Sequence, residues 1–269
     1  MNCNQRLLIA LMLGVMCAAA SAGEPMPRKV QLLQTKTGDR FGIWGEKPKA
    51  PAPTLFILAS GISDALGSPY FRQCGNVLAE HGYLCASVDL PGLSSWSGRC
   101  QKGEDFVAEV NRKMTRVLDH LIADGYTDPA KVAICGTSRG GFLALHFAAH
   151  DERVRCAVGY APVTVLTAME EFRAAKDNEL AKSLALSRQA DKLAGRAVWI
   201  AICEGDSRVG TEHAVDLARR IKDAASARKL EDRVELHVAK QPRGHTTPPG
   251  ASAKSAEWIL KQLGGGKAK

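Results

Sequence analysis

Several features that define other classes of protein are missing from this chain of 269 residues. Beyond its N-terminal apolar run, no stretch is long and apolar enough to span a bilayer. The cysteines and histidines show no C-x-x-C pair or other zinc-ligand spacing. There is no internal repeat, no nucleic-acid-binding motif and no basic patch interleaved with aromatic residues. These absences argue against a membrane-spanning protein, a zinc protein and a nucleic-acid-binding protein.

The N-terminus has the pattern of a secretory signal peptide. Arg6 is the only charged side chain before an apolar run from Leu7 to Ala20, and Ala20-Ser21-Ala22 is an A-x-A cleavage signal. The run is shorter than the roughly 20 residues that a spanning helix needs. We therefore expect residues 1–22 to be removed and the mature protein, residues 23–269, to be exported to the periplasm or secreted.

The mature part is long enough for one sizeable hydrophobic core and short for two domains. Its formal net charge falls from +8 to +7 when Arg6 is removed. A generic solvated surface explains this moderate positive net charge better than a basic binding face does. We expect a single domain.

Six of the eight cysteines lie in the mature part. Export permits disulfides. Four of the six lie in expected strands or at their ends, where buried free thiols are common: Cys85, Cys135, Cys156 and Cys203. Cys74 and Cys100 lie outside the expected strands and are the pair to test first.

Strand and helix patterns alternate along the chain, which is typical of an α/β protein with a mainly parallel sheet and helices on both faces. The apolar runs predict strands at Lys29–Thr35, Arg40–Glu46, Thr54–Ala59, Tyr83–Asp89, Lys131–Cys135, Val154–Tyr160, Arg196–Cys203 and Arg233–Ala239. Helical spacing predicts helices within Ser68–Gly82, Gly103–Gly125, Gly141–Ala149, Thr211–Ala227 and Ser252–Leu263.

The stretch Gly136-Thr137-Ser138-Arg139-Gly140 carries the most chemical information. It reads G-x-S-x-G and lies between an expected strand and an expected helix. In that context the serine occupies a sharp, strained turn that exposes its hydroxyl above a sheet, and the glycines allow the strand and the helix to approach closely. Ser138 is therefore a candidate nucleophile.

A serine hydroxyl is a poor nucleophile at neutral pH and needs an adjacent base, which a carboxylate in turn orients. His245 is the best candidate base because it lies in a Gly/Pro-rich loop between the last strand and the closing helix. The other histidines fall within a strand or beside helices. Asp206 and Glu204 both follow the strand that ends at Cys203, at the sheet edge where catalytic groups gather, and both are candidate acids.

These motifs resemble the α/β-hydrolase superfamily, and in particular the dienelactone-hydrolase and prolyl-oligopeptidase-like serine hydrolases. The order nucleophile, acid, histidine agrees. The resemblance implies that Asp206 is the acid, because Asp206-Ser207-Arg208-Val209 matches that family's Asp-x-Arg-Val pattern. The dienelactone branch uses a cysteine where this chain has Ser138, so that particular activity is not implied.

The resemblance also implies an oxyanion hole of backbone amides. One amide is that of Arg139, directly after the nucleophile. The second comes from Ser60-Gly61-Ile62, which stands in place of the family's His-Gly-x segment; Ile62 is the preferred donor and Ser63 the alternative. Ser94-Ser95-Trp96 offers an aromatic wall for the site, unless the tryptophan serves packing. The insertion Val163–Leu193 is expected to be either a small helical cap over the site or surface helices on the edge of the core.

The sequence thus predicts an exported serine hydrolase that cleaves carboxylic esters through a Ser-His-Asp triad and an acyl-enzyme, without metal or organic cofactor. Its expected partner is a small-molecule ester or a short peptide. A peptidase or amidase of the prolyl-oligopeptidase-like type is the alternative, and a non-enzymatic binding protein on a hydrolase fold is a second alternative. Acyl and alcohol specificity and oligomeric state stay open.

Overall fold

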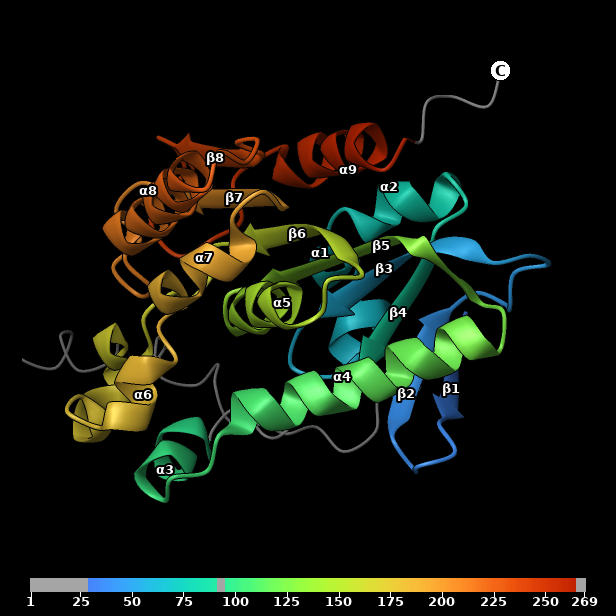
Figure 1. Ribbon diagram of the computed structural model, residues 1–269, viewed down its shortest axis with the longest axis horizontal. Coiled ribbons are helices and arrows are strands. Elements are labelled where there is room, and N and C mark those ends of the chain that lie inside the picture. Colours follow the sequence, from blue (N-terminus) through green and yellow to red (C-terminus); the bar gives the residue numbers. More distant parts are fainter. Residues whose placement is uncertain (1–28, 91–94, 265–269) are drawn as a thin grey trace, which may run out of the picture.

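The computed structural model describes residues 29–90 and 95–264, so the expected signal peptide lies outside the described residues. They form an eight-stranded sheet in the order β1-β2-β4-β3-β5-β6-β7-β8 (Figure 1). The strands are β1 (Val30–Gln34), β2 (Arg40–Trp44), β3 (Ala52–Leu58), β4 (Leu84–Val88), β5 (Thr127–Thr137), β6 (Val154–Tyr160), β7 (Ala197–Cys203) and β8 (Val234–Ala239).

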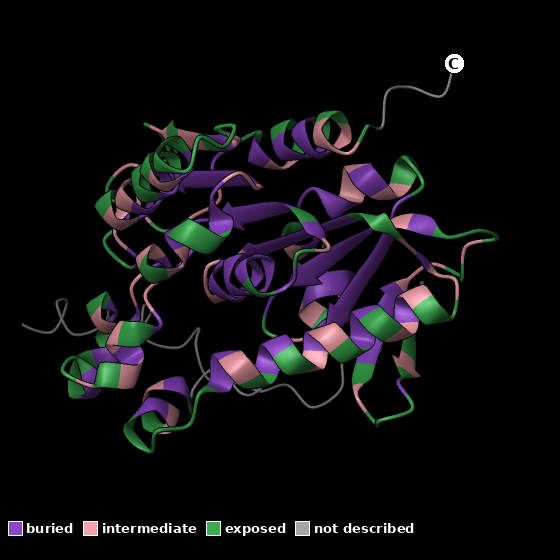
Figure 2. Cartoon of the chain, in the orientation of Figure 1, coloured by how far each residue is buried: buried purple, intermediate pink, exposed green. Residues whose placement is uncertain are grey.

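β2 runs antiparallel to its neighbours β1 and β4, and all other strand pairs are parallel. Parallel neighbours need a crossover connection, which the intervening helices supply. The sheet is buried between helices on both faces (Figure 2). The expected α/β architecture with a mainly parallel sheet is confirmed.

Alternation along the strands builds a separate core on each face of the sheet. In β3, Phe56 and Leu58 point into one core, and Leu55 and Ile57 point into the other. The first core is covered by α4 (Phe106–Ala123), α5 (Arg139–His150) and α8 (Thr211–Ala227). The second is covered by the π-helix η2 (Ser63–Gly67), α2 (Gly75–Glu80) and α9 (Ala251–Gln262). α5 and α9 therefore pack against opposite faces of the sheet.

The helix expected within Ser68–Gly82 is divided in two. α1 (Pro69–Arg72) ends where Gln73 takes φ 49° and ψ −124°, and α2 begins after Cys74. A non-glycine residue at positive φ cannot continue a right-handed helix. Sequence periodicity does not reveal this break, because Gln73 is an ordinary helix former.

The insertion Val163–Leu193 contains η4 (Leu166–Ala168), η5 (Glu170–Ala175), α6 (Glu179–Ser183), η6 (Leu186–Gln189) and α7 (Ala190–Leu193). It contacts α3 (Trp96–Gln101): the Asn178 amide donates to the Cys100 carbonyl at 3.0 Å, and the Gln101 amide donates to the Ala174 carbonyl at 3.2 Å. These bonds hold the insertion against the α4 and α5 side of the molecule.

Trp96 is a core residue and not an exposed wall. Its side chain is buried, and its ring stacks on Phe106 with centroids 4.3 Å apart. It also lies 5.8 Å from the ring of Phe142 on α5. Three aromatic rings thus fix α3 to α4 and α5.

The cysteine pair singled out from sequence is wrong. All six cysteines of the described residues are buried and unpaired. Cys74 lies in the core beneath α2 and α9, whereas Cys100 lies in the core beneath α4 and α5. The sheet separates the two thiols, so no disulfide geometry is available to them. Among residues 29–90 and 95–264, no helix has the length and apolar character to cross a membrane.

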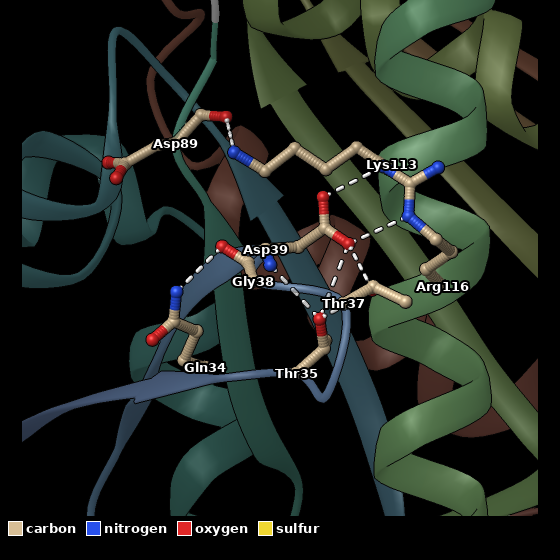
Figure 3. A network of polar contacts seen from close by, with 8 residues as sticks. All are labelled: Gln34, Thr35, Thr37, Gly38, Asp39, Asp89, Lys113 and Arg116. Carbon is tan, nitrogen blue, oxygen red and sulfur yellow. Dashed lines mark hydrogen bonds and ion pairs between the residues drawn. The ribbon is translucent and has the colours of Figure 1, made fainter.

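A polar network attaches the β1–β2 turn to α4 (Figure 3). The carboxylate of Asp39 accepts two hydrogen bonds from the Arg116 guanidinium, at 2.7 and 2.8 Å, and one from the Thr37 hydroxyl at 2.8 Å. Nearby on α4, Lys113 donates to the backbone carbonyl of Asp89 at 2.6 Å. The hydrogen bond from Arg116 holds the pKa of Asp39 far below its usual range, against the opposing effect of burial.

We expect Asp39→Asn to lower the free energy of unfolding by about 1–2 kcal/mol at pH 7, because the bidentate charged pair is lost. The loss stays this small because the Arg116 side chain is partly exposed. A carboxyl group with a lowered folded-state pKa stabilises above its ordinary pKa of 3.8 and loses that effect as the pH falls further. The difference between wild type and variant should therefore shrink from pH 5 to pH 3 in urea unfolding. A constant difference over this range would contradict the pairing.

Candidate active site

Ser138 occupies a strained turn between β5 and α5. Its backbone has φ 54° and ψ −114°. Its amide donates to the Tyr160 carbonyl at 2.8 Å, and its carbonyl accepts from the amides of Phe142 and Val163, both at 3.1 Å. These bonds to the neighbouring strand, the helix and the following loop hold a backbone conformation that a non-glycine residue rarely adopts.

The two glycines of the motif are required by close backbone approach. A Cβ atom on Gly140 would lie 2.0 Å from the carbonyl oxygen of Leu58 on β3. A Cβ atom on Gly136 would lie 2.3 Å from the carbonyl carbon of Gly140. Neither neighbour is a flexible side chain, so only glycine fits at these positions.

His245 and Asp206 lie beside this turn. The Nε2 atom of His245 is 3.1 Å from the Ser138 Oγ atom, and its Nδ1 atom is 2.8 Å from an Asp206 carboxylate oxygen. The His245 loop is held by the Gly244 amide, which donates to the Glu204 carbonyl at 3.1 Å. The structure thus brings the three residues expected from sequence into one hydrogen-bonded line.

The Asp206 carboxylate is fully buried, whereas the His245 side chain is 26% exposed. One Asp206 oxygen accepts the amides of Arg208 at 3.1 Å and Val209 at 3.2 Å, which leaves the other oxygen for His245. Burial alone raises the pKa of Asp206, but the hydrogen bond and charge of His245 and the two amide donors outweigh it, so the pKa lies below its ordinary value. The group therefore stays ionised.

The rival candidates lie elsewhere. The Glu204 carboxylate faces the Arg243 guanidinium at 3.5 Å and not His245. His237 on β8 stacks on Trp199. His146 on α5 is buried against the carbonyl of Leu184, and this burial lowers its pKa to about 4. The contacts of these three side chains are therefore structural and lie outside the line of hydrogen bonds at Ser138.

A cavity of about 300 Å³ opens at Ser138 and His245. Tyr70 and Phe71 of α1 provide an aromatic part of its lining, and Arg139 and Arg208 also line the cavity. The sequence analysis placed a possible aromatic wall at Trp96 and missed the adjacent aromatic pair Tyr70-Phe71, which follows the expected oxyanion loop and could have signalled it.

Arg139 begins α5 and lines the cavity, as an oxyanion donor must. The segment after β3 contributes other residues to the lining than the preferred donor Ile62. Ala59 and Ser60 line the cavity. Ile62 is buried in the core beneath α2 and α9, and it is not among the residues that line the cavity. The amide of Ile62 and its alternative, that of Ser63, stay predictions, and the Ser60 amide is a further candidate.

An ion pair links the insertion to Arg208, a residue that lines the cavity. Arg208 forms a salt bridge with Glu171 of η5. The residues that line the cavity within the described part of the chain come from outside Val163–Leu193. A covering role for the insertion therefore remains a prediction.

A mainly parallel sheet with a serine on the turn after its central strand, and a histidine and a carboxylate beside it, define an α/β-hydrolase. Its site places the protein in the class of serine hydrolases. The model of the prolyl oligopeptidase family matches residues 69–265, and the chain belongs to this family. The resemblance stated from the motifs is confirmed at this level.

Similar proteins include both peptidases and esterases. Acylamino-acid-releasing enzyme 1 of Oryza sativa subsp. japonica is 30% identical over 131 residues, which is 48% of this chain and only 15% of that protein. Among solved structures, a cold-adapted esterase from an Arctic intertidal metagenomic library gives a TM-score of 0.62 at 17% identity, covering 90% of this chain and 99% of the esterase. A putative dipeptidyl aminopeptidase IV from Bacteroides ovatus gives 0.67 at 15% identity, covering 88% of this chain and 35% of that one. These structural likenesses establish the fold.

We expect Gly140→Ala to lower the free energy of unfolding by about 3 kcal/mol or more, because the added methyl group meets the backbone of Leu58. Gly98→Ala is the matched control, since a Cβ atom there meets nothing within 4 Å and lies in α3. The control should unfold at an unchanged or slightly higher urea concentration. Equal midpoints for the two variants would disprove the close approach.

Proposed function

We propose that the protein is an exported serine hydrolase that cleaves carboxylic esters through Ser138, His245 and Asp206. The observation that carries the proposal is the line of hydrogen bonds from Ser138 Oγ to His245 Nε2, at 3.1 Å, and from His245 Nδ1 to Asp206, at 2.8 Å. The expected signal peptide at residues 1–22 supports export.

In the proposed reaction, Ser138 Oγ attacks the ester carbonyl carbon while its proton passes to His245 Nε2. Asp206 holds the imidazole with Nδ1–H towards the carboxylate and stabilises the imidazolium. The tetrahedral intermediate collapses as His245 gives its proton to the leaving alcohol. Water, deprotonated by His245, then attacks the acyl-enzyme carbonyl and releases the acid and the free Ser138 hydroxyl.

The negative oxygen of the tetrahedral intermediate requires preorganised donors. We infer that the Arg139 amide is one of them, because it starts α5 directly after the nucleophile, where a helix N-terminus also favours negative charge. The second donor is the amide of Ile62, or in its place that of Ser63 or Ser60, in the segment after β3. Ser60 is supported by its place in the cavity lining.

An ester substrate is supported by esterases among the similar structures and by the size of the cavity. The Arctic esterase and an acetyl xylan esterase from Paenibacillus sp. R4 match over 99% and 87% of their own lengths. The cavity at Ser138 is also small, at about 300 Å³.

A serine peptidase is the second candidate. It is supported by the match to the prolyl oligopeptidase family and by the identity to the acylamino-acid-releasing enzyme of rice. In both candidates the insertion Val163–Leu193 is proposed as a cap, since Glu171 pairs with Arg208 at the cavity.

The mature protein should hydrolyse p-nitrophenyl acetate and butyrate faster than the decanoate, because the cavity is small, and it should also cleave methyl butyrate. Ser138→Ala should lose about 10⁴-fold or more in kcat. Steady-state rates measure both effects. N-acetylated peptides and their p-nitroanilides, tested beside the esters, should be poor substrates.

Turnover of N-acetylated peptides with kcat/KM above about 10⁴ M⁻¹s⁻¹, without turnover of methyl butyrate, would replace the esterase by the peptidase. Failure of a fluorophosphonate probe to label Ser138 in folded protein would favour the binding-protein alternative.

Asp206→Asn should lower kcat by about 10³–10⁴-fold, because an amide cannot stabilise the imidazolium and favours the wrong tautomer. Glu204→Gln is the matched control on the same loop and should stay within about threefold of wild type, since its carboxylate faces Arg243. Rates on p-nitrophenyl acetate distinguish the two. A larger loss in Glu204→Gln would reassign the acid.

A further inference from the structure

Gln73 has two properties that are rare together in a loop between short helices. Its side chain is buried, with 3% of the residue exposed. Its backbone lies at φ 49° and ψ −124°, close to the φ 54° and ψ −114° of Ser138. Such a conformation persists only where the surroundings enforce it, and strained residues cluster at functional sites.

The amide group of Gln73 uses both of its hydrogen-bonding ends. Its Nε2 atom donates to the hydroxyl of Thr247 at 3.0 Å and to the hydroxyl of Thr137 at 3.3 Å. Its Oε1 atom accepts the hydroxyl of Ser252 at 2.5 Å. Two donated bonds and one accepted bond fix the orientation of the amide.

Two of the three partners belong to the segments that carry the nucleophile and the base. Thr137 ends β5 and directly precedes Ser138, whereas Thr247 lies two residues after His245. Ser252 lies in the first turn of α9. One buried amide therefore connects the nucleophile turn, the histidine loop and the helix that follows it.

The helix α9, which carries Ser252, is in turn hydrogen-bonded to β6 through Ser255 and Tyr160. Ser255 on α9 donates to the Ser252 carbonyl at 3.1 Å and shares a hydrogen bond of 2.5 Å with the Tyr160 hydroxyl. The Tyr160 carbonyl accepts the Ser138 amide. The contacts thus form a closed ring that runs from Ser138 through Tyr160, α9 and Gln73 back to Thr137.

We propose that Gln73 is a positioning residue that sets the distance between Ser138 Oγ and His245 Nε2. This inference rests on the proposed function of Ser138 and His245. The side-chain chemistry singles out glutamine: glutamate has no N–H group to donate to the two threonines, and methionine has the same length but neither donates nor accepts strongly. Displacing a nucleophile from its base by about 1 Å can lower the rate of the reaction about 100-fold.

The test compares Gln73→Met and Gln73→Glu with Thr54→Val. Thr54 makes a buried hydroxyl hydrogen bond of 2.8 Å to Thr127 at the opposite end of β3 and β5, so it matches the lost bond without touching the site. We expect both Gln73 variants to lose about 10–100-fold in kcat on p-nitrophenyl acetate, with KM within about twofold. Thr54→Val should keep the wild-type kcat at a comparable loss of thermal stability.

A second arm keeps the test decisive if the Gln73 variants do not fold. Thr247→Val removes the acceptor on the histidine loop, and Thr247→Ser restores it. The valine variant should lose about tenfold in kcat and the serine variant should recover most of it, with melting temperatures recorded for both.

The rate at which a fluorophosphonate labels Ser138 separates the outcomes. Slow labelling of the Gln73 and Thr247→Val variants beside fast labelling of wild type supports the inference. Wild-type labelling rates in these variants, or an equal loss of kcat in Thr54→Val, would overturn it and leave the hydrolase intact. An unlabelled wild-type protein would overturn the proposed function and the inference with it.

Discussion

The site depends on one steric constraint, which is that three backbone segments meet without side chains between them at the end of β5. Gly140 passes within contact distance of the Leu58 carbonyl, and Gly136 packs directly on Gly140. This contact forces α5 to start at once after the strand and leaves Ser138 at positive φ. The hydroxyl consequently stands above the carboxyl edge of the sheet, where the loops that follow β7 and β8 can reach it.

Burial and exposure are divided between the two polar groups beside that turn, Asp206 and His245. Asp206 is buried and satisfied by two backbone amides and the imidazole, so its charge is fixed in place. His245 keeps contact with solvent and with the cavity. The arrangement gives the imidazole one rigid partner and one reactive partner, which is what a group that must take and return a proton requires.

The sequence predicted most of the elements, as well as Ser138 and His245, because each depends on local pattern. Apolar runs marked the strands, and G-x-S-x-G between a strand and a helix marked the turn at Ser138. The choice of Asp206 over Glu204 needed the family resemblance, and the structure gives it a geometric reason. The break at Gln73, the burial of Trp96 and the separation of Cys74 from Cys100 depend on contacts between distant segments, which periodicity does not encode. The Ile62 amide and the cap stay predictions for the same reason.

Because the six thiols are buried only after folding, the order of folding and thiol oxidation matters. Burial raises the pKa of Cys85 and of Cys156 to about 12, so these thiols are un-ionised and shielded in the folded protein. In the unfolded chain all six are accessible and reactive, and they can be joined in many non-native ways. In an oxidising compartment, a chain that folds first is protected by its own core, whereas a chain that meets an oxidant first is trapped. In such a compartment, the yield of folded protein would therefore depend on whether the core forms before the thiols are oxidised.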